Sequence, residues 1–188
     1  IDTLSPASVV SAKAGSPVLL ELDNGDRLET DLLVVADGAR SGLRAALGID
    51  CREQRYGEHA IIANVAHRKP HNGRAFERFT AEGPLAMLPL VPERSGSYRS
   101  ALVWTRPPGD AARMLEASEA DFLSALQRAF GYRLGRLQHV GERNSYPLAL
   151  VEAQEQVRSG VVVMGNAAHA LHPVVGQGFN LALRDVSC

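Results

Sequence analysis

Two short apolar runs stand out, one near each end of the chain. Residues 32–36 read Leu-Leu-Val-Val-Ala, and residues 161–164 read Val-Val-Val-Met. Continuous apolar runs of this length are typical of strands that are buried on both faces, as in a parallel sheet beneath helices. Each run leads into a glycine-containing turn, at residues 37–38 and 165–166. We therefore predict two buried strands that each end in a loop.

Turn and cap residues predict the elements around the first run. Asn24-Gly25 separates two strand-like segments. Both residue types tolerate a positive φ, so we expect a two-residue hairpin turn. Ser41 precedes the sequence GLRAAL. This order predicts a short helix that the serine hydroxyl caps and Gly48 ends.

The middle of the chain, residues 50–147, has a different pattern of apolar and turn-forming residues. The segments EHAIIANVAH, LAMLPL and YRSALVWT have strand-like apolar content and are separated by turn-rich sequence. The sequence RPPGD then opens a helical stretch. Ser118 and Asp121 form a short version of a capping box, and apolar residues follow at helical spacing up to Gly131. We predict an antiparallel sheet with one or two helices.

The second apolar run continues into a glycine-rich stretch, and a helix is expected to start at Asn180. A buried strand that ends in a glycine-rich loop and opens a helix is typical of ligand sites in α/β folds.

The composition is that of a globular protein. Hydrophobic residues make up 45% of the chain, charged residues 22%, and the formal net charge is -1. This balance gives no reason to expect a nucleic-acid partner. No apolar run reaches the roughly 18–20 residues that span a bilayer. Cys51 and Cys188 lie far apart, and His169 and His172 have no third ligand at a suitable spacing, so we expect no metal site.

Two stretches carry the most specific motifs. Residues 31–44 read DLLVVADGARSGLR, and residues 160–186 read GVVVMGNAAHALHPVVGQGFNLALRDV. They resemble the DG motif and the second FAD motif of the flavin-dependent aromatic hydroxylases, in the order that this family shows. The resemblance implies a mixed α/β (α+β) fold, in which part of an FAD-binding Rossmann-like domain accompanies an antiparallel-sheet substrate domain.

The resemblance also implies a division of the chain. Residues 1–48 and 148–188 would belong to the FAD-binding domain, and residues 49–147 to the substrate domain. The GxGxxG unit with which the family begins has no match in this sequence. We therefore expect the chain to be the central fragment of a longer monooxygenase and to be inactive by itself.

One departure from the motif indicates a branch of the family. Asn166 stands where the family usually has Asp, and residues 74–90, RAFERFTAEGPLAMLPL, also resemble the ubiquinone-biosynthesis branch. The resemblance implies FAD-dependent hydroxylation of a polyprenylated phenol, with O₂ and a reduced donor, NAD(P)H.

The resemblance assigns cofactor contacts to both motifs. Gly165 lets the backbone approach FAD closely, and the side chain of Asn166 would hold a ribityl hydroxyl. Asp37 and Gly38 would lie near the FAD pyrophosphate and the site of the reduced nicotinamide. Arg44 would meet phosphate or tie the loop together, and a purely structural salt bridge is an alternative.

The glycine-rich part of the second motif is assigned to the flavin ring. The backbone from Gly176, Gln177 and Gly178 to Asn180 would stabilise the negative charge of reduced flavin, helped by the helix dipole. Pro173 is expected to be the residue at the catalytic centre, because its carbonyl would lie near the flavin edge at which oxygen reacts.

The expected partners follow from the same resemblance. They are a polyprenyl phenol, and either the surface of the inner membrane or other proteins of ubiquinone biosynthesis, with a cytoplasmic location. Two alternatives stay open at this point. One is a non-catalytic substrate-binding or interaction module, and the other is a flavoprotein of the same fold with another reaction.

Overall fold

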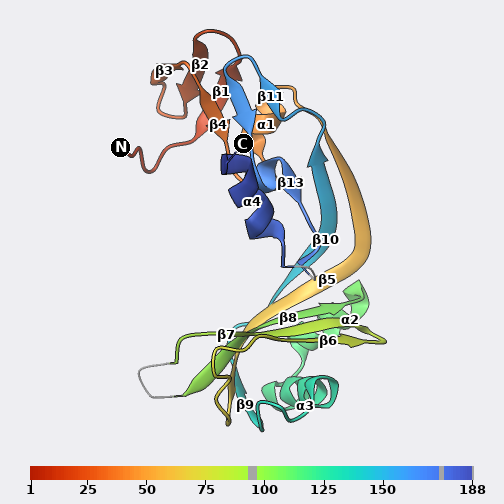
Figure 1. Cartoon of the computed structure of the whole chain (residues 1–188). Coiled ribbons are helices and arrows are strands. Elements are labelled where there is room, and N and C mark those ends of the chain that lie inside the picture. The colour runs from red at the N-terminus through yellow and green to blue at the C-terminus, as the bar shows by residue number, and fades with distance from the viewer. Residues whose placement is uncertain (93–96, 174–175, 188) are drawn as a thin grey trace. The chain divides into compact units, whose positions relative to one another are not determined.

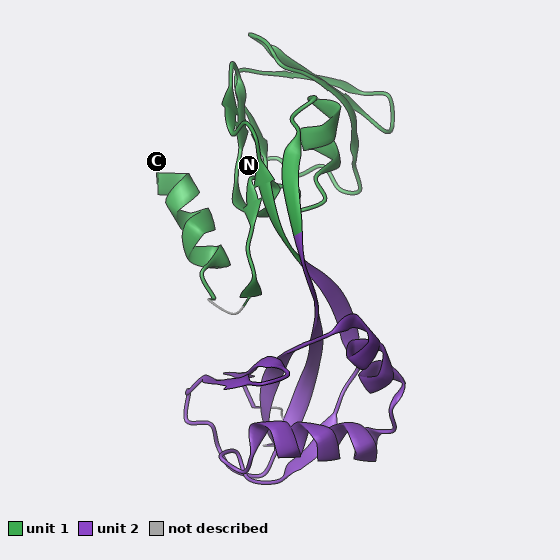
Figure 2. Ribbon diagram, turned by 90° about the vertical axis from the view of Figure 1, so that its right-hand side faces the viewer, with its two compact units in different colours: residues 1–54, 149–188 green, residues 55–148 purple. Residues whose placement is uncertain are grey.

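The computed structural model describes residues 1–92, 97–173 and 176–187. Two compact units are present, the first formed by residues 1–54 and 149–188 and the second by residues 55–148 (Figure 2). The first division falls after residue 54 rather than after residue 48, because the long strand β5 (Cys51–His67) begins within the first unit. The assignment of these units to FAD and to substrate stays a prediction.

Two strands, β5 and β10 (Asn144–Ala153), run from one unit into the other. The other strands of the first unit are β1 (Val9–Lys13), β2 (Val18–Leu22), β3 (Arg27–Thr30), β4 (Leu33–Val35), β11 (Val157–Arg158), β12 (Val161–Val163) and β13 (His169–Ala170). Its helices are α1 (Gly42–Ala46), the 3-10 helix η1 (Gly165–Ala167) and α4 (Gly178–Ser187). The second unit adds β6 (Phe76–Thr80), β7 (Gly83–Pro89), β8 (Tyr98–Arg106), β9 (Leu137–Val140), α2 (Pro108–Glu116) and α3 (Glu119–Phe130).

The first unit contains a parallel pair of strands formed by the two apolar runs. Strands β4 and β12 pair in parallel, with Val34 opposite Val162, inside a three-stranded sheet of order β11-β12-β4. A second sheet, β1-β2-β3, is antiparallel. The core of this unit is formed by Val18, Leu33, Val35, Leu47, Ile49, Val161, Val163, Ala167 and Ala168. The two apolar runs therefore form strands, as predicted, and the structure shows that these strands are neighbours.

Burial of the first run on both faces is wrong. Leu33 and Val35 are buried, but the Val34 side chain between them is 47% exposed and Leu32 is 55% exposed. Successive side chains of a strand point to opposite faces of the sheet. Only one face of β4 packs against the core of the unit, so alternate residues of the run remain exposed.

The predicted hairpin is present, but its connection is one residue longer. Leu22 and Asp26 close the turn through a hydrogen bond from Leu22 N to Asp26 O of 2.9 Å, which leaves residues 23–25 between them. Gly25 has a φ of 88°, whereas Asn24 is not among the residues with a positive φ. A three-residue loop places only its last residue in the left-handed region, and that residue is the glycine.

The helix after Ser41 is confirmed. The Ser41 hydroxyl accepts a hydrogen bond from Arg44 N at 2.8 Å, and α1 ends at Ala46 with Leu47 as its cap. Gly48 follows with a φ of 67° and donates its N–H to Ala45 O. The left-handed conformation of Gly48 ends the helix at the predicted place.

The second unit is an antiparallel sheet with two helices, as predicted. Its strands follow the order β5-β8-β7-β6, and β9 pairs with β5 (Figure 1). Helices α2 and α3 cover one face of this sheet. The shared core contains Ile61, Ala63, Val65, Leu85, Met87, Leu102, Trp104, Ala111, Phe122, Leu126, Phe130, Leu134, Leu137 and Val140. The capping box is also confirmed, because Ser118 Oγ accepts from Asp121 N at 3.1 Å.

Within the described part of the chain, none of the helices is both long enough and apolar enough to cross a membrane.

A buried histidine lies at the end of β5. His67 is 1% exposed, and its ring nitrogens contact Lys69 O at 2.8 Å and Ser100 Oγ at 3.0 Å. Burial lowers the pKa of His67 below its ordinary value of 6.5, and the nearby His71 ring adds to this effect. The folded state therefore favours neutral His67, while the unfolded chain binds a proton at higher pH.

We predict that this histidine weakens the fold in acid. As the pH falls below about 6.5, the unfolded state gains protons first, so the free energy of unfolding decreases. His67→Gln removes the titrating group, while the other five histidines are common to both proteins. Urea unfolding at pH 7.5 and 5.5 should show a larger loss of stability in the parent than in the variant. Equal losses in the two proteins would contradict this role of His67.

Candidate functional site

The two motif loops meet at one edge of a sheet. Strands β4 and β12 are parallel, so their carboxyl ends reach the same edge, and Met164 N donates to Val35 O at 3.0 Å there. Asp37 and Gly165 each follow two residues after the end of their strand. Ligands of α/β sheets bind at this edge, where loops follow the strands. The structure thus brings the residues that directly follow the two strands, Asp37 and Gly165, to the same edge of the sheet.

Arg44 ties the two loops to each other. Its side chain is only 6% exposed, and Nη1 donates to Ala167 O at 2.6 Å while Nη2 donates to Ala39 O at 3.2 Å. One guanidinium group therefore holds a carbonyl from each motif. Of the roles that the sequence left open for Arg44, this geometry supports the one in which it ties the loop together. A contact of Arg44 with phosphate stays a prediction.

Asp37 stabilises the loop that follows β4. Its carboxylate oxygen Oδ2 accepts a hydrogen bond from Leu43 N at 3.2 Å. Leu43 lies in the first turn of α1, where backbone N–H groups lack partners within the helix and a negative charge is favourable. The Asp37 side chain is exposed to solvent.

Helix α4 begins two residues earlier than expected. The sequence predicts a start at Asn180, but the helix runs from Gly178, because the carbonyl of Gln177 already accepts a hydrogen bond from Leu181 N at 2.9 Å. The Asn180 side chain donates from Nδ2 to Gln177 Oε1 at 2.9 Å. The glycine-rich stretch therefore contributes to the first turn of the helix itself.

Two further predicted residues of the second motif are exposed to solvent. Asn166 is in the 3-10 helix η1 with an exposed side chain, and Pro173 is exposed as well. The Pro173 carbonyl accepts a hydrogen bond from Gly176 N at 3.0 Å. These residues are thus accessible to a ligand, and their roles stay predictions.

Three glycines leave room for a ligand against the backbone. A Cβ built at Gly38, Gly176 or Gly178 would meet no protein atom within 4 Å. By contrast, a Cβ at Gly165 would lie 3.8 Å from Ala182 Cβ. Open backbone next to the first turn of a helix suits a large anionic cofactor, because both N–H groups and the helix dipole are available. The residues present therefore fit a flavin dinucleotide.

Sequence reasoning missed one residue of this site. The carboxylate of Asp185, in the last turns of α4, accepts a hydrogen bond from Gly165 N at 2.9 Å. The same oxygen lies 3.2 Å from His169 Nε2. No local pattern in the sequence marks Asp185, because its partners are reached only when α4 lies against the residues after β12.

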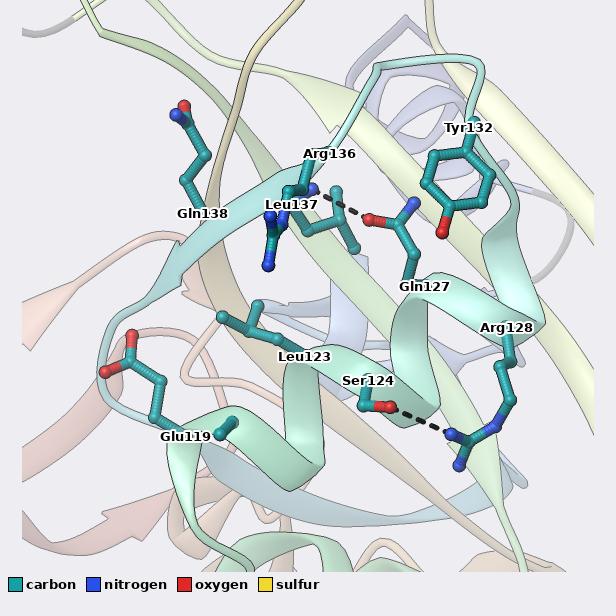
Figure 3. Close-up of a pocket in the computed structure, with 10 residues that line it drawn as sticks. Glu119, Leu123, Ser124, Gln127, Arg128, Tyr132, Arg136, Leu137 and Gln138 are labelled. Carbon is teal, nitrogen blue, oxygen red and sulfur yellow. Dashed lines mark hydrogen bonds between the residues drawn. The ribbon is translucent and has the colours of Figure 1, made fainter.

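The groove in Figure 3 lies elsewhere, on the second unit. It has a volume of about 1100 Å³ and lies between α3 and the segment that includes β9, with Glu119, Gln127, Arg128, Tyr132 and Arg136 among its lining residues. The ten described residues that line it include none of the predicted site residues. Among residues 1–92, 97–173 and 176–187, no group of three or more His, Cys, Asp or Glu side chains is arranged to hold a metal ion.

A parallel strand pair whose loops lead into helix starts is typical of the ligand-binding edge of α/β folds, and an antiparallel sheet places the chain in the mixed α/β class. The chain belongs to the FAD binding domain family, whose model matches residues 10–188. The predicted family, fold class and FAD cofactor are thereby confirmed.

Relatives and solved structures agree with this family. Ubiquinone hydroxylase UbiL of Rhodospirillum rubrum is 38% identical over 185 residues, which cover 98% of this chain and 42% of that protein. The 3-demethoxyubiquinol 3-hydroxylase of Escherichia coli is 30% identical over 89% of this chain and 41% of its own length. The flavin-dependent halogenase CmlS superposes with a TM-score of 0.76 at 16% identity, over 96% of this chain and 34% of that one. This last likeness shows the fold alone. The chain spans about two fifths of the length of the two relatives.

We predict that Arg44 is required for the stability of the first unit. Arg44→Ala leaves the buried carbonyl of Ala167 without its partner, which costs about 1–3 kcal/mol. Urea unfolding should show this loss, and Arg44→Lys should recover only part of it, because one ammonium cannot serve both carbonyls. Arg40→Ala, an exposed arginine of the same loop, is the matched control and should change little. Equal stability of the Arg44 and Arg40 variants would contradict the role of Arg44 in linking the two loops.

Proposed function

We propose that this chain forms the flavin-binding loops and the substrate sheet of an FAD-dependent monooxygenase that hydroxylates a polyprenylated phenol in ubiquinone biosynthesis. The observation that carries the proposal is the meeting of the two motif loops at one sheet edge, with three open glycines beside them. The names of the relatives, a ubiquinone hydroxylase and a demethoxyubiquinol hydroxylase, support the reaction and the pathway.

The proposed cofactor contacts use backbone more than side chains. The Asn166 amide holds the ribityl chain, Gly165 lets that chain approach the backbone closely, and Asp37 with Gly38 lies near the pyrophosphate. The N–H groups of Gln177, Gly178 and Asn180 stabilise negative charge on the flavin ring, since the start of α4 leaves them without partners inside the helix. The N–H of Gly176 is bonded to Pro173 O, so Gly176 contributes through its open backbone instead. When bound, FAD supplies the electron transfer and the activation of oxygen.

The remaining cofactor-side assignments complete the proposal. The Pro173 carbonyl faces the part of the site where oxygen reacts, and NAD(P)H is the donor of electrons. The protein's task is to hold the phenol ring still and to exclude water while the oxygen atom is transferred.

We propose that the substrate lies against the uncovered face of the second unit's sheet. Ile62 pairs with Val103, and Val103 pairs with Ala86, so these three side chains share one face across β5, β8 and β7. Their neighbours in sequence form the core on the opposite face, beneath the helices. The three residues are half-buried and apolar. Such a surface suits an isoprenoid chain and an aromatic ring.

The proposed substrate partitions into lipid, because its isoprenoid chain is apolar. We therefore propose peripheral contact with the inner membrane, or with other proteins of ubiquinone biosynthesis, as the route by which the phenol reaches the sheet.

The cofactor part of the proposal predicts the effect of Gly178→Val in the full-length protein. A Cβ at this position meets no protein atom, so the substitution leaves the fold intact but occupies the space of the ligand. We expect FAD affinity to fall by about tenfold or more, as titration of the flavin absorbance would show. Gly109→Val, at an open glycine in the first turn of α2 and outside both motifs, is the control. Undiminished FAD binding by the Gly178 variant would exclude this loop from the site.

The substrate part predicts the effect of a charge on the sheet face. Val103→Asp should raise KM for a short-chain prenylated phenol by about tenfold, while FAD binding stays unchanged. The reason is that an apolar ligand on this face would remove water from the new carboxylate, which costs free energy. The control Gln138→Asp places the same charge in the groove of Figure 3. The measurement is oxygen- and phenol-dependent oxidation of NAD(P)H. An unchanged KM in the Val103 variant would argue against this face, and FAD reduction without phenol dependence would indicate another reaction.

A further inference from the structure

Helix α4 is held to the first unit without a buried side chain. None of its described residues is buried, and Phe179, Leu183 and Val186 are 73%, 51% and 70% exposed. The direction of a helix is normally fixed by the apolar face that it packs against a core. Leu181 and Ala182 are only half-buried, so hydrophobic packing within this unit is too slight to fix by itself where the first turn of α4 points.

Polar contacts of Asp185 provide the attachment instead. Its Oδ2 accepts from Gly165 N at 2.9 Å and lies 3.2 Å from His169 Nε2. The two side chains are 19% and 17% exposed, so this contact is largely shielded from water. His169 Nε2 is buried and has no hydrogen bond of good geometry in the described part of the chain, and the Asp185 carboxylate is the acidic group beside it.

This attachment acts at both ends of the second motif. Gly165 begins the motif, directly after β12, and Asp185 lies near the end of α4. Gly178 starts the same helix seven residues earlier, or roughly 10 Å along the axis. Because a helix is stiff over two turns, fixing Asp185 against Gly165 fixes the position of the N–H groups at Gly178 and after it.

We propose that Asp185 is the positioning residue of the flavin site: it binds Gly165 and His169 and thereby aims the first turn of α4 at the flavin ring. The inference rests on the proposed FAD site and adds the residue that orients it. Asp185 itself does not touch the cofactor. Its carboxylate sets the orientation of N–H donors whose effect depends on where they point.

The experiment compares three variants of the full-length protein. Asp185→Ala removes both contacts, Asp185→Asn keeps an oxygen that accepts from Gly165 N–H, and Arg184→Gln alters an exposed neighbour in the same turn. Three quantities are measured for each: the Kd for FAD, the midpoint potential of bound flavin, and the urea midpoint of the FAD-free protein.

We expect Asp185→Ala to weaken FAD binding about tenfold and to make the midpoint potential of the flavin more negative. The reason is that the N–H donors at the start of α4, which stabilise the reduced, negatively charged flavin, are no longer held in the orientation that binding requires. Asp185→Asn should recover most of the affinity, and Arg184→Gln should change neither quantity. The urea midpoint of the FAD-free protein should stay near that of the parent, since α4 contributes no buried residue.

Two results would overturn the inference while leaving the proposed function standing. One is a parent-like Kd and potential in Asp185→Ala. The other is weaker FAD binding with an unchanged potential and a lowered urea midpoint, which would make Asp185 merely structural. Failure of the parent protein to bind FAD would overturn the proposed function together with this inference.

Discussion

The parallel pairing of β4 with β12 is the constraint on which the candidate site depends. Three residues of each strand form the ladder, yet this short contact brings the loops after residues 35 and 163 to one edge. Arg44 then reinforces the junction, because its buried guanidinium bonds to a carbonyl 123 residues away. Every predicted cofactor contact lies on one of the two loops or on a helix that follows one of them. Without this register, the motifs would be unrelated surface segments.

The strands, hairpin and caps could be predicted because their causes are local. An apolar run limits the conformations of its own residues, and Ser41 or Ser118 caps the helix that follows it directly. The exposure of Val34 could not be predicted, because it depends on which element covers that face of the sheet. The start of α4 was misjudged for a related reason. Gln177 serves as the first acceptor through its backbone, which any residue can provide.

The candidate site shows the same division between local and distant causes. Resemblance to a family gave the residues of both loops, whereas spacing alone would have favoured an ordinary glycine-rich turn. Asp185 escaped notice because its partners, Gly165 and His169, lie 20 and 16 residues earlier in the chain and are met only once the helix folds back. A lone aspartate in an exposed helix has no local signal that separates it from a solvated charge. Contacts that orient a site are therefore harder to infer than contacts that form it.

The two kinds of contact found here have complementary consequences for binding. Arg44 uses carbonyl groups, and Asp185 uses the N–H of Gly165, so both satisfy backbone groups that face the inside of the unit. Loops that are held by such contacts are ordered before a ligand arrives, and preorganisation of this kind lowers the entropic cost of binding. The glycines of these loops have a separate cause in the backbone itself. Gly38, Gly165 and Gly176 have φ values of 93°, 59° and 59°, a region that residues with a side chain rarely adopt. The conformation of the loops therefore selects glycine at these positions independently of any ligand.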